Sequence, residues 1–232
     1  HESLSEQYGA DSQPYFFVNC IEFVLKWLDY HDGIYGMQLN LTHPDVMSKL
    51  SHKNCELVVQ HHDWMDDSDK RNSRWMKKNF MLAKKYYPMF NVKKNTDFYK
   101  NRLQTAASME KLSGLSPYIG LIKKGLGLGV YRHIPDQGEY SSLMHHKFLV
   151  GMRTDGDGNF LVSVVYGSFN LSTAATNNLE SILVWDDNPR LATHLHHELA
   201  CACATGQVTA WEDFVQTEKF IENDRDYPNV YV

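Results

Sequence analysis

Three short apolar segments in the second half of the chain decide its fold: MHHKFLV at residues 144–150, FLVSVVY at 160–166 and SILVW at 181–185. Segments of this length, rich in β-branched and aromatic residues, are typical of strands. The sequence DGDGN at 155–159 predicts a hairpin turn between the first two. We therefore expect these three strands to form the centre of a sheet.

The first half of the chain alternates helix and strand patterns. Apolar residues at helical spacing predict a helix over 18–28, and Pro44 suits the first turn of a second helix that ends near residue 50. Strands are predicted over 34–41 and 55–60. Such alternation is typical of parallel strands joined by helical crossovers, so the expected fold class is α/β with a mixed sheet.

The remaining elements lie on either side of the three central strands. A glycine-rich stretch at 125–129 precedes a predicted strand over 130–134. Asn188 and Pro189 are typical of a helix start, and a last helix is predicted over 212–222, so residues 188–232 are expected to form C-terminal helices. With 232 residues and no linker or repeat, the chain is predicted to be a single domain over 1–232.

The charge of the chain is strongly uneven. The net charge is -5, yet residues 70–124 hold 14 Lys or Arg and two acids, which leaves +12 there and -17 elsewhere. We interpret residues 63–128 as a basic, partly helical insertion in the domain. A polyanion would then bind one face only. A solvated lysine-rich helix surface is the alternative.

One predicted helix carries much of this charge. Met76, Phe80, Ala83 and Tyr87 fall within one narrow helical stripe, which predicts a packed side. The other sides carry cations, and these are the expected nucleic-acid-binding residues: Arg74, Lys77, Lys78, Lys84 and Lys85. Aromatic residues of the same stretch, Trp75, Tyr86 and Tyr87, are expected to be core or interface residues, with base stacking as the alternative.

The composition excludes some classes of protein. No apolar run reaches the roughly 18 residues that a membrane span needs, so a transmembrane protein and stable membrane insertion are not expected. Four scattered cysteines are too few for a disulfide scaffold, which favours a reducing compartment and a cytoplasmic location. Because the numbering begins at His1, we expect a tag remnant or a processed fragment there.

Polar side chains gather at the ends of the predicted central strands. His145 and Lys147 are two residues apart, so they emerge on one side of their strand, and His146 points the other way. Ser168 and Asn170 close the next strand at the same spacing, and Glu180 opens the third. Open α/β folds build sites at such strand ends.

The chemistry of these side chains is that of phosphoryl transfer. The His145 imidazole can attack phosphorus and form a phosphohistidine intermediate. Lys147, Ser168 and Asn170 can donate to the non-bridging oxygens as charge develops on them. Glu180 would fix the imidazole tautomer if it reached the far ring nitrogen. This set needs neither metal nor cofactor, and we expect none.

The residues HHKFLV at 145–150, YGSFNLSTAA at 166–175 and NLESILVW at 178–185 carry a family likeness. With them the sequence resembles the phospholipase D superfamily, whose motif is H-x-K followed by G-S-x-N, and it looks most like the single-motif nucleases of that superfamily. The resemblance implies a phospholipase D-like mixed β-sheet with helices on both faces. It also implies a metal-independent phosphodiesterase or endonuclease that cleaves DNA or RNA.

The sequence departs from the family pattern at one position. The family usually has an aspartate seven residues after the histidine, and here Met152 occupies that place. Relatives that cleave protein adducts from DNA ends also lack this aspartate, so its absence does not by itself imply inactivity. Asp155 or Asp157 could substitute for it.

The motif occurs once, whereas the family's reaction uses two histidines. The chain therefore carries half a site, and a twofold homodimer would supply His145 from the second copy as the general acid. Two alternatives remain: a phospholipase D-type lipid phosphodiesterase, and a catalytically inactive nucleic-acid-binding member of the fold.

Two other clusters invite a metal interpretation. His61, His62 and Asp63 follow a predicted strand, and we interpret them as a solvated strand end. The second cluster matches neither C-x-x-C pairs nor H-E-x-x-H spacing, and its side chains leave one helix in several directions, so we expect no zinc there. Its members are His194, His196, His197, Glu198, Cys201 and Cys203.

Overall fold

The structure is a computed structural model that describes residues 12–17, 19–65, 73–90, 127–132, 143–157, 160–204, 208–211 and 214. Within these ranges the chain forms an eight-stranded sheet in the order β1-β7-β6-β5-β2-β3-β4-β8. The strands are β1 (Ser12–Phe17), β2 (Gly33–Gln38), β3 (Asn54–Gln60), β4 (Leu128–Tyr131), β5 (Lys147–Thr154), β6 (Phe160–Gly167), β7 (Glu180–Trp185) and β8 (Val208–Ala210). β2, β3 and β4 run parallel, and the other neighbouring pairs are antiparallel. The predicted mixed sheet is therefore confirmed.

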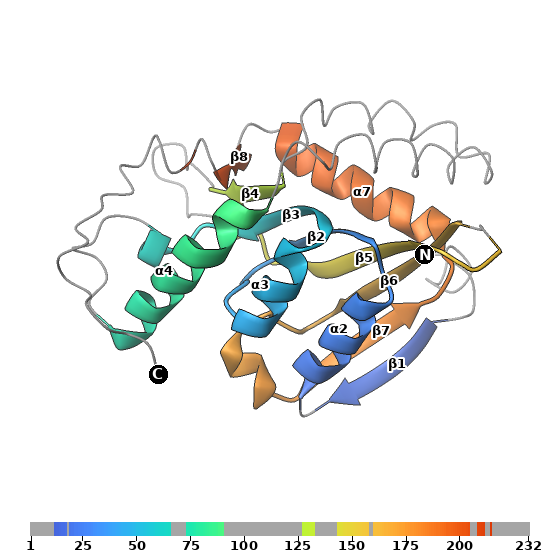
Figure 1. Ribbon diagram of the computed structural model, residues 1–232, viewed down its shortest axis with the longest axis horizontal. Helices are drawn as coiled ribbons and strands as arrows, with labels where there is room; N and C mark the ends of the chain where they lie inside the picture. The colour runs from blue at the N-terminus through green and yellow to red at the C-terminus, as the bar shows by residue number, and fades with distance from the viewer. Residues whose placement is uncertain are drawn as a thin grey trace.

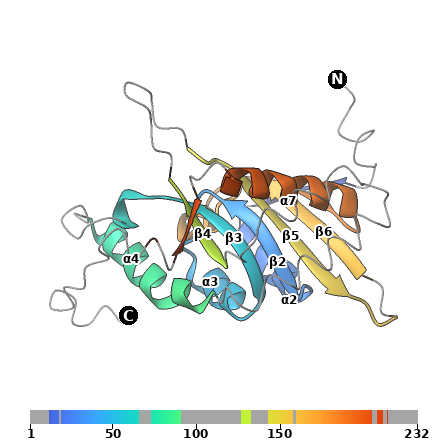
Figure 2. The same cartoon turned by 90° about the horizontal axis from the view of Figure 1, so that it is seen from above.

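Helices cover both faces of this sheet, as predicted (Figures 1 and 2). α2 (Cys20–Asp29) and α3 (Pro44–Ser51) lie on one face, with α4 (Arg74–Tyr86) beside α3, and α7 (Pro189–Ala204) lies on the other. Each face has its own apolar core because strand side chains alternate between the faces. The chain therefore folds as a three-layer α/β structure.

The basic helix α4 has the two-sided character that its sequence predicts. Ser73 caps it, since its hydroxyl accepts a hydrogen bond from the Met76 N–H at 3.1 Å. Phe80 and Ala83 are buried in the core, and Tyr87, just past the helix end, donates its hydroxyl hydrogen bond to the Leu41 carbonyl at 2.9 Å. Packing of this apolar stripe fixes the helix with its cations on the remaining sides.

The α7 helix also begins where the sequence predicts. The Asn188 side chain accepts a hydrogen bond from the Leu191 N–H at 3.0 Å, which is the bond expected of a helix cap. Leu191, Leu195 and Leu199 are buried against the sheet. No helix in the described part of the chain has the length and apolar character needed to cross a bilayer.

Several predicted boundaries were wrong. β5 begins at Lys147, so His145 and His146 precede the strand instead of lying inside it. β1 and β8 were not predicted; both are edge strands, and Pro14 in β1 is tolerated there because an edge strand leaves one side of its backbone unpaired. The strand predicted over 130–134 runs from Leu128 to Tyr131. The helix predicted over 212–222 and most of the basic insertion lie outside the described residues.

Candidate active site

The predicted site residues come together at one end of the sheet. In the β2–β5 pair Gln38 lies opposite Lys147, and in the β5–β6 pair Phe148 lies opposite Tyr166, one residue before Gly167. Gly167 in turn lies opposite Ile182, near the start of β7. The beginnings of β5 and β7 therefore meet the ends of β2 and β6, and we call this end of the sheet the catalytic edge.

His145 and Lys147 are in contact at the catalytic edge. The Lys147 Nζ lies 3.1 Å from Nδ1 and 3.3 Å from Nε2 of His145, and it donates to the His145 carbonyl at 3.1 Å. The His145 side chain is exposed, whereas Lys147 is only 6% exposed. Burial lowers the pKa of Lys147, and the charge of Glu180 opposes this shift. An exposed imidazole thus stands against a partly desolvated ammonium group.

Glu180 binds Ser168 instead of His145. The Ser168 hydroxyl donates to Glu180 Oε2 at 2.5 Å, and the Asn178 amide donates to Oε1 at 3.3 Å. Glu180 was expected to reach the far ring nitrogen of His145, and no hydrogen bond joins the two in the described residues. Its negative charge acts on Lys147, so it is placed to attract the ammonium group.

Steric crowding explains why a glycine precedes Ser168. A Cβ at Gly167 would collide with the backbone carbonyl of Ser181. This close approach of β6 and β7 lets the Ser168 N–H donate to the Ser181 carbonyl at 3.0 Å and lets the Ser168 hydroxyl accept from the Ser181 N–H at 3.0 Å. Ser168 is thereby held beside Glu180.

Asn170 lies at the same edge, half-buried. The next residue donates its N–H to the Asn40 carbonyl at 3.0 Å, so the loop after β6 is fastened to the loop after β2. Oδ1 of Asn170 is buried and has no hydrogen-bond partner among the described residues, and the same holds for Oδ1 of Asn40.

His146 points away from the predicted nucleophile, as expected. Its ring meets Phe148 edge to face, with centroids 6.1 Å apart, and Phe148 belongs to the core under α7. Its carbonyl accepts a hydrogen bond from the Leu39 N–H at 3.1 Å. His146 therefore anchors the segment that carries His145 against the end of β2.

The place of the family aspartate is buried. Met152 is fully buried in the core under α7, so its side chain takes no part in the catalytic edge. Asp155 accepts a hydrogen bond from the Asp157 N–H at 3.0 Å in the turn beyond β5. That turn lies a strand length of roughly 25 Å from Lys147 at about 3.3 Å per residue. Whether Asp155 or Asp157 replaces the aspartate stays a prediction.

The basic side chains of α4 face solvent. Arg74, Lys77, Lys78 and Lys85 are exposed and Lys84 is half-buried. Burial lowers the pKa of His43, the charge of Asp45 opposes this shift, and the charge of Lys78 adds to it. The His43 N–H donates to the Leu171 carbonyl at 2.9 Å, directly after Asn170. The charge of Lys78 therefore acts on a histidine that is hydrogen-bonded to the residue after Asn170.

The three aromatic residues in and just after α4 that were considered for base stacking differ in exposure. Tyr87 is buried in the core, which excludes it from base stacking. Tyr86 is half-buried against the core, and the Lys85 ammonium lies 4.9 Å from the centre of its ring. Trp75 is 54% exposed. Trp75 is thus the one of these three whose ring is available to a ligand.

The second histidine and cysteine cluster spreads around α7. His196 is buried with its ring edge-on to Tyr35, at a centroid distance of 5.1 Å. Cys201 contacts His197, with Sγ 3.4 Å from Nε2. In the described part of the chain, no three or more His, Cys, Asp or Glu side chains form a group that could hold a metal ion.

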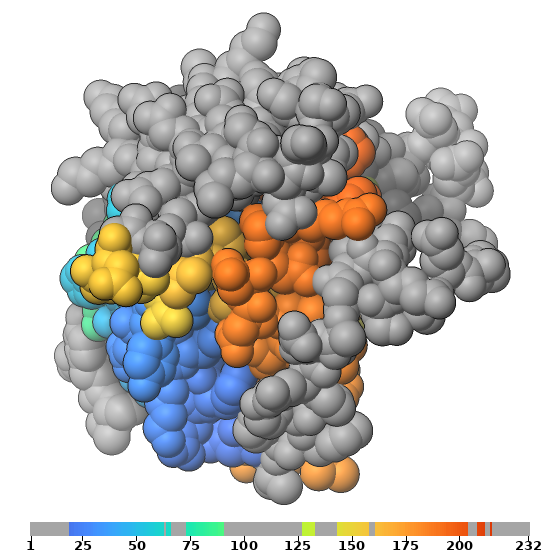
Figure 3. Space-filling model, turned by 90° about the vertical axis from the view of Figure 1, so that its right-hand side faces the viewer, coloured from blue at the N-terminus to red at the C-terminus, as the bar shows by residue number. Residues whose placement is uncertain are grey.

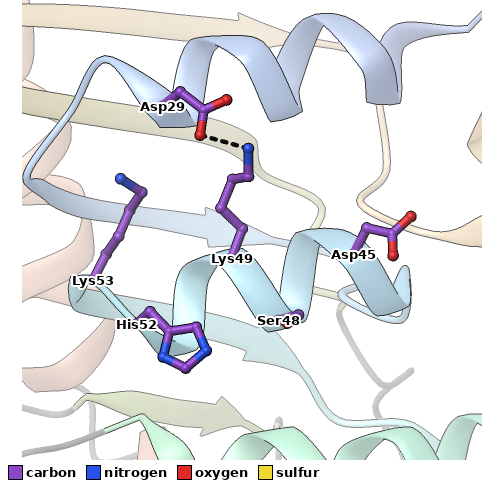
Figure 4. A pocket seen from close by; sticks show the side chains of 6 residues that line it. All are labelled: Asp29, Asp45, Ser48, Lys49, His52 and Lys53. Carbon is purple, nitrogen blue, oxygen red and sulfur yellow. Dashed lines mark hydrogen bonds and ion pairs between the residues drawn. The ribbon is translucent and has the colours of Figure 1, made fainter.

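Two surface hollows lie away from the catalytic edge. One of about 310 Å³ is lined by Trp27, His31, Arg153, Ser163 and Asp186, among others, at the opposite end of the sheet, where the segments coloured blue, yellow and orange meet in Figure 3. The other, of about 460 Å³, lies between α2 and α3 (Figure 4). The Lys49 ammonium there pairs with Asp29 at 2.5 Å, and that of Lys53 donates to the His31 carbonyl.

Comparison with known proteins gives structural similarities only. No family model matches the sequence, and no curated protein matches it. Nuc from Salmonella typhimurium, a phospholipase D family member, is similar at a TM-score of 0.46 and 16% identity, over 87% of this chain and 97% of that one. NucT from Helicobacter pylori is similar at 0.43 and 13% identity, over 87% and 100%. Phosphatidylserine synthase from Haemophilus influenzae is similar at 0.39 and 13% identity, over 94% of this chain and 42% of its own.

Proposed function

We propose that this chain is a phosphodiesterase of the phospholipase D type that cleaves nucleic acid without a metal, through a covalent intermediate on His145. The observation that carries the proposal is the contact of an exposed imidazole with the Lys147 ammonium at 3.1 Å. The proposed nucleophile and a cation for the phosphate thus lie side by side at the catalytic edge, where Ser168 and Glu180 also lie.

The reaction has two displacements. In the first, a ring nitrogen of His145 bonds to phosphorus, the bond from phosphorus to the leaving oxygen breaks, and a general acid gives that oxygen a proton. In the second, water loses a proton to the same group and displaces the histidine, which restores the enzyme. Lys147 and the amide of Asn170 hold the non-bridging oxygens as charge develops, and Ser168, whose one hydroxyl proton goes to Glu180, positions that carboxylate.

The general acid is proposed to come from a second copy of the chain. One H-x-K motif supplies one histidine, and a twofold axis through the catalytic edge would bring the partner subunit's His145 to the far side of the phosphate. The exposed position of His145 favours this arrangement, because an exposed side chain at an edge can face a partner.

Helix α4 favours nucleic acid over lipid as the substrate. Its exposed cations lie on one helix, and the charge of Lys78 acts on His43, whose N–H donates to the residue after Asn170, which supports a binding track beside the catalytic edge. A row of cations suits the regular phosphates of a polynucleotide backbone. Two copies of α4 in a dimer would lengthen the track.

Loss of these cations is expected to weaken binding without affecting the chemistry. Changing Lys77, Lys78, Lys84 and Lys85 to alanine should flatten the dependence of log Kd on log salt by up to about four units, since each lost phosphate contact removes about one. Fluorescence anisotropy with a labelled oligonucleotide between about 50 and 300 mM salt measures the slope. An unchanged slope would place the nucleic acid on another surface.

The proposed function is tested with a panel of substrates in EDTA. We expect purified protein to cleave labelled single-stranded DNA, double-stranded DNA or RNA as fast in EDTA as without it, and to leave phosphatidylcholine vesicles intact. Loss of cleavage in EDTA would reject the metal-free mechanism. Vesicle hydrolysis alone would identify a lipid phosphodiesterase, and binding without cleavage would identify an inactive member of the fold.

A further inference from the structure

Gln38 lies directly across the sheet from Lys147. It is the last residue of β2, and the antiparallel β2–β5 register pairs the two residues. Directly opposite residues of an antiparallel pair have their side chains on the same face and near each other. Gln38 is 1% exposed and Lys147 is 6% exposed. The side chains of Gln38 and Lys147 are therefore buried neighbours on the same face of the sheet, at the catalytic edge.

The carbonyl oxygen of the Gln38 side chain has no hydrogen-bond partner in the part of the chain that the structure describes. Its Nε2 donates to the Phe148 carbonyl at 3.4 Å, which fixes the amide orientation, because the reversed amide would set two oxygens against each other. Oε1 is buried without a hydrogen bond. A buried unpaired acceptor is unfavourable, so its presence next to a catalytic group calls for an explanation.

A second buried glutamine shows what a structural role looks like in this sheet. Gln60 ends β3 as Gln38 ends β2, and it is 5% exposed. Its Nε2 donates to the His61 carbonyl at 3.1 Å, and its Oε1 accepts from the Met144 N–H at 2.7 Å. Both ends of the Gln60 amide thus have hydrogen-bond partners, whereas of the Gln38 amide only Nε2 has one among the described residues.

Lys147 occupies a position that it must leave before His145 can react. Its ammonium contacts both ring nitrogens of His145, and an attacking nitrogen must turn its lone pair toward phosphorus. The other attractive group is the Glu180 carboxylate, which is already engaged by Ser168 and Asn178. Among the described residues, Gln38 Oε1 is an acceptor without a hydrogen bond to give up, and unlike Oδ1 of Asn40 and of Asn170 it belongs to the residue paired with Lys147 in the sheet.

We propose that Gln38 is a positioning residue: its Oε1 accepts a hydrogen bond from the Lys147 ammonium group when a substrate phosphate enters the site. One N–H of the ammonium then binds Gln38, and the others point to the non-bridging oxygens of the phosphate. No covalent bond changes in this step, and the ammonium keeps its proton. The inference rests on the proposed function, because the phosphate is that of the scissile phosphodiester.

The proposal predicts opposite pH shifts for two substitutions. Lys147 is faced by His145 from its own segment, by Glu180 from β7 and by Gln38 from β2, with Cys20 of α2 close to Glu180. Gln38→Met keeps the shape and removes the acceptor, so the ammonium is less favoured in the loaded site. Gln38→Glu keeps an acceptor and adds negative charge, so the ammonium is more favoured.

The experiment compares kcat as a function of pH for the full chain and its variants. We expect Gln38→Met to lower kcat about tenfold and to move the alkaline limb to lower pH, and Gln38→Glu to move that limb to higher pH. Gln60→Met is the matched control: it should lower the thermal midpoint, because it breaks the bond to Met144, and leave the alkaline limb in place. An alkaline limb that stays in place in both Gln38 variants would overturn the proposal.

A binding measurement separates this inference from the proposed function. Calorimetry with inorganic phosphate reports the site without turnover, and Gln38→Met is expected to weaken phosphate binding several-fold. Wild-type protein that neither binds phosphate nor cleaves nucleic acid contradicts the proposed function itself. Wild-type protein that does both, with Gln38→Met equal to it in both assays, contradicts only the role of Gln38.

Discussion

Replacing His145 by alanine is expected to lower the cleavage rate at least about 10³-fold, because a covalent mechanism has no route to the intermediate without its nucleophile. The side chain is exposed, so its loss opens no cavity in the core. Oligonucleotide affinity should change little, since the proposal assigns the phosphate contacts to α4. The rate, the thermal midpoint and the affinity are measured on the same preparation, with His146→Ala as the control. Retained turnover in His145→Ala would reject the mechanism.

The same variant tests the shared site. When wild-type and His145→Ala chains exchange freely at equal amounts, about one quarter of the dimers carry two intact histidines. If a site needs both, the activity per total protein falls to about one quarter, whereas independent sites would retain about one half. A value near one half would therefore contradict the homodimer, and it would leave the role of His145 as nucleophile untouched.

The strands that carry the motif could be predicted because their sequences are unambiguous. Val162, Val164 and Val165 in β6 and the apolar run after Lys147 in β5 leave no competing helical pattern, and the turn at 155–157 joins them. The edge strands β1 and β8 escaped prediction because β1 contains a proline and β8 has three residues. Neither carries enough periodicity to be seen without its partner strand.

The contacts inside the site could not be predicted for a different reason. Sequence spacing places Ser168, Lys147 and Glu180 at strand ends, yet it does not give the depth of each side chain. The close approach of β6 and β7 at Gly167 brings Ser168 within hydrogen-bond distance of Glu180, so the Glu180 carboxylate binds the Ser168 hydroxyl and not His145. Gln38 belongs to no sequence motif, and its place opposite Lys147 is seen only in the β2–β5 register.

Replacing Lys147 by methionine should separate stability from activity. Methionine fills the space of the lysine stem, and we expect the rate to fall about 10²- to 10³-fold as the charge on the phosphate oxygens loses its cation. Folding should become no less stable, because burial of an ammonium group is unfavourable and lowers the pKa of Lys147. Lys49→Met is a suitable control, since Lys49 pairs with Asp29 away from the catalytic edge.

The direction of the pKa shift of Lys147 determines how the stability gained in Lys147→Met changes with pH. The folded-state pKa of Lys147 lies below the ordinary lysine value of 10.5, so between the two values the unfolded chain binds the proton more readily than the folded one. The Lys147 contribution to the free energy of unfolding therefore rises with pH across that window, and it is least favourable below it. Urea unfolding of wild-type and Lys147→Met protein at neutral pH and near pH 10 measures the difference. The gain from methionine should be largest at neutral pH and shrink as the pH rises, and a loss of stability at neutral pH would show that the Lys147 contacts to His145 outweigh the cost of burying the charge.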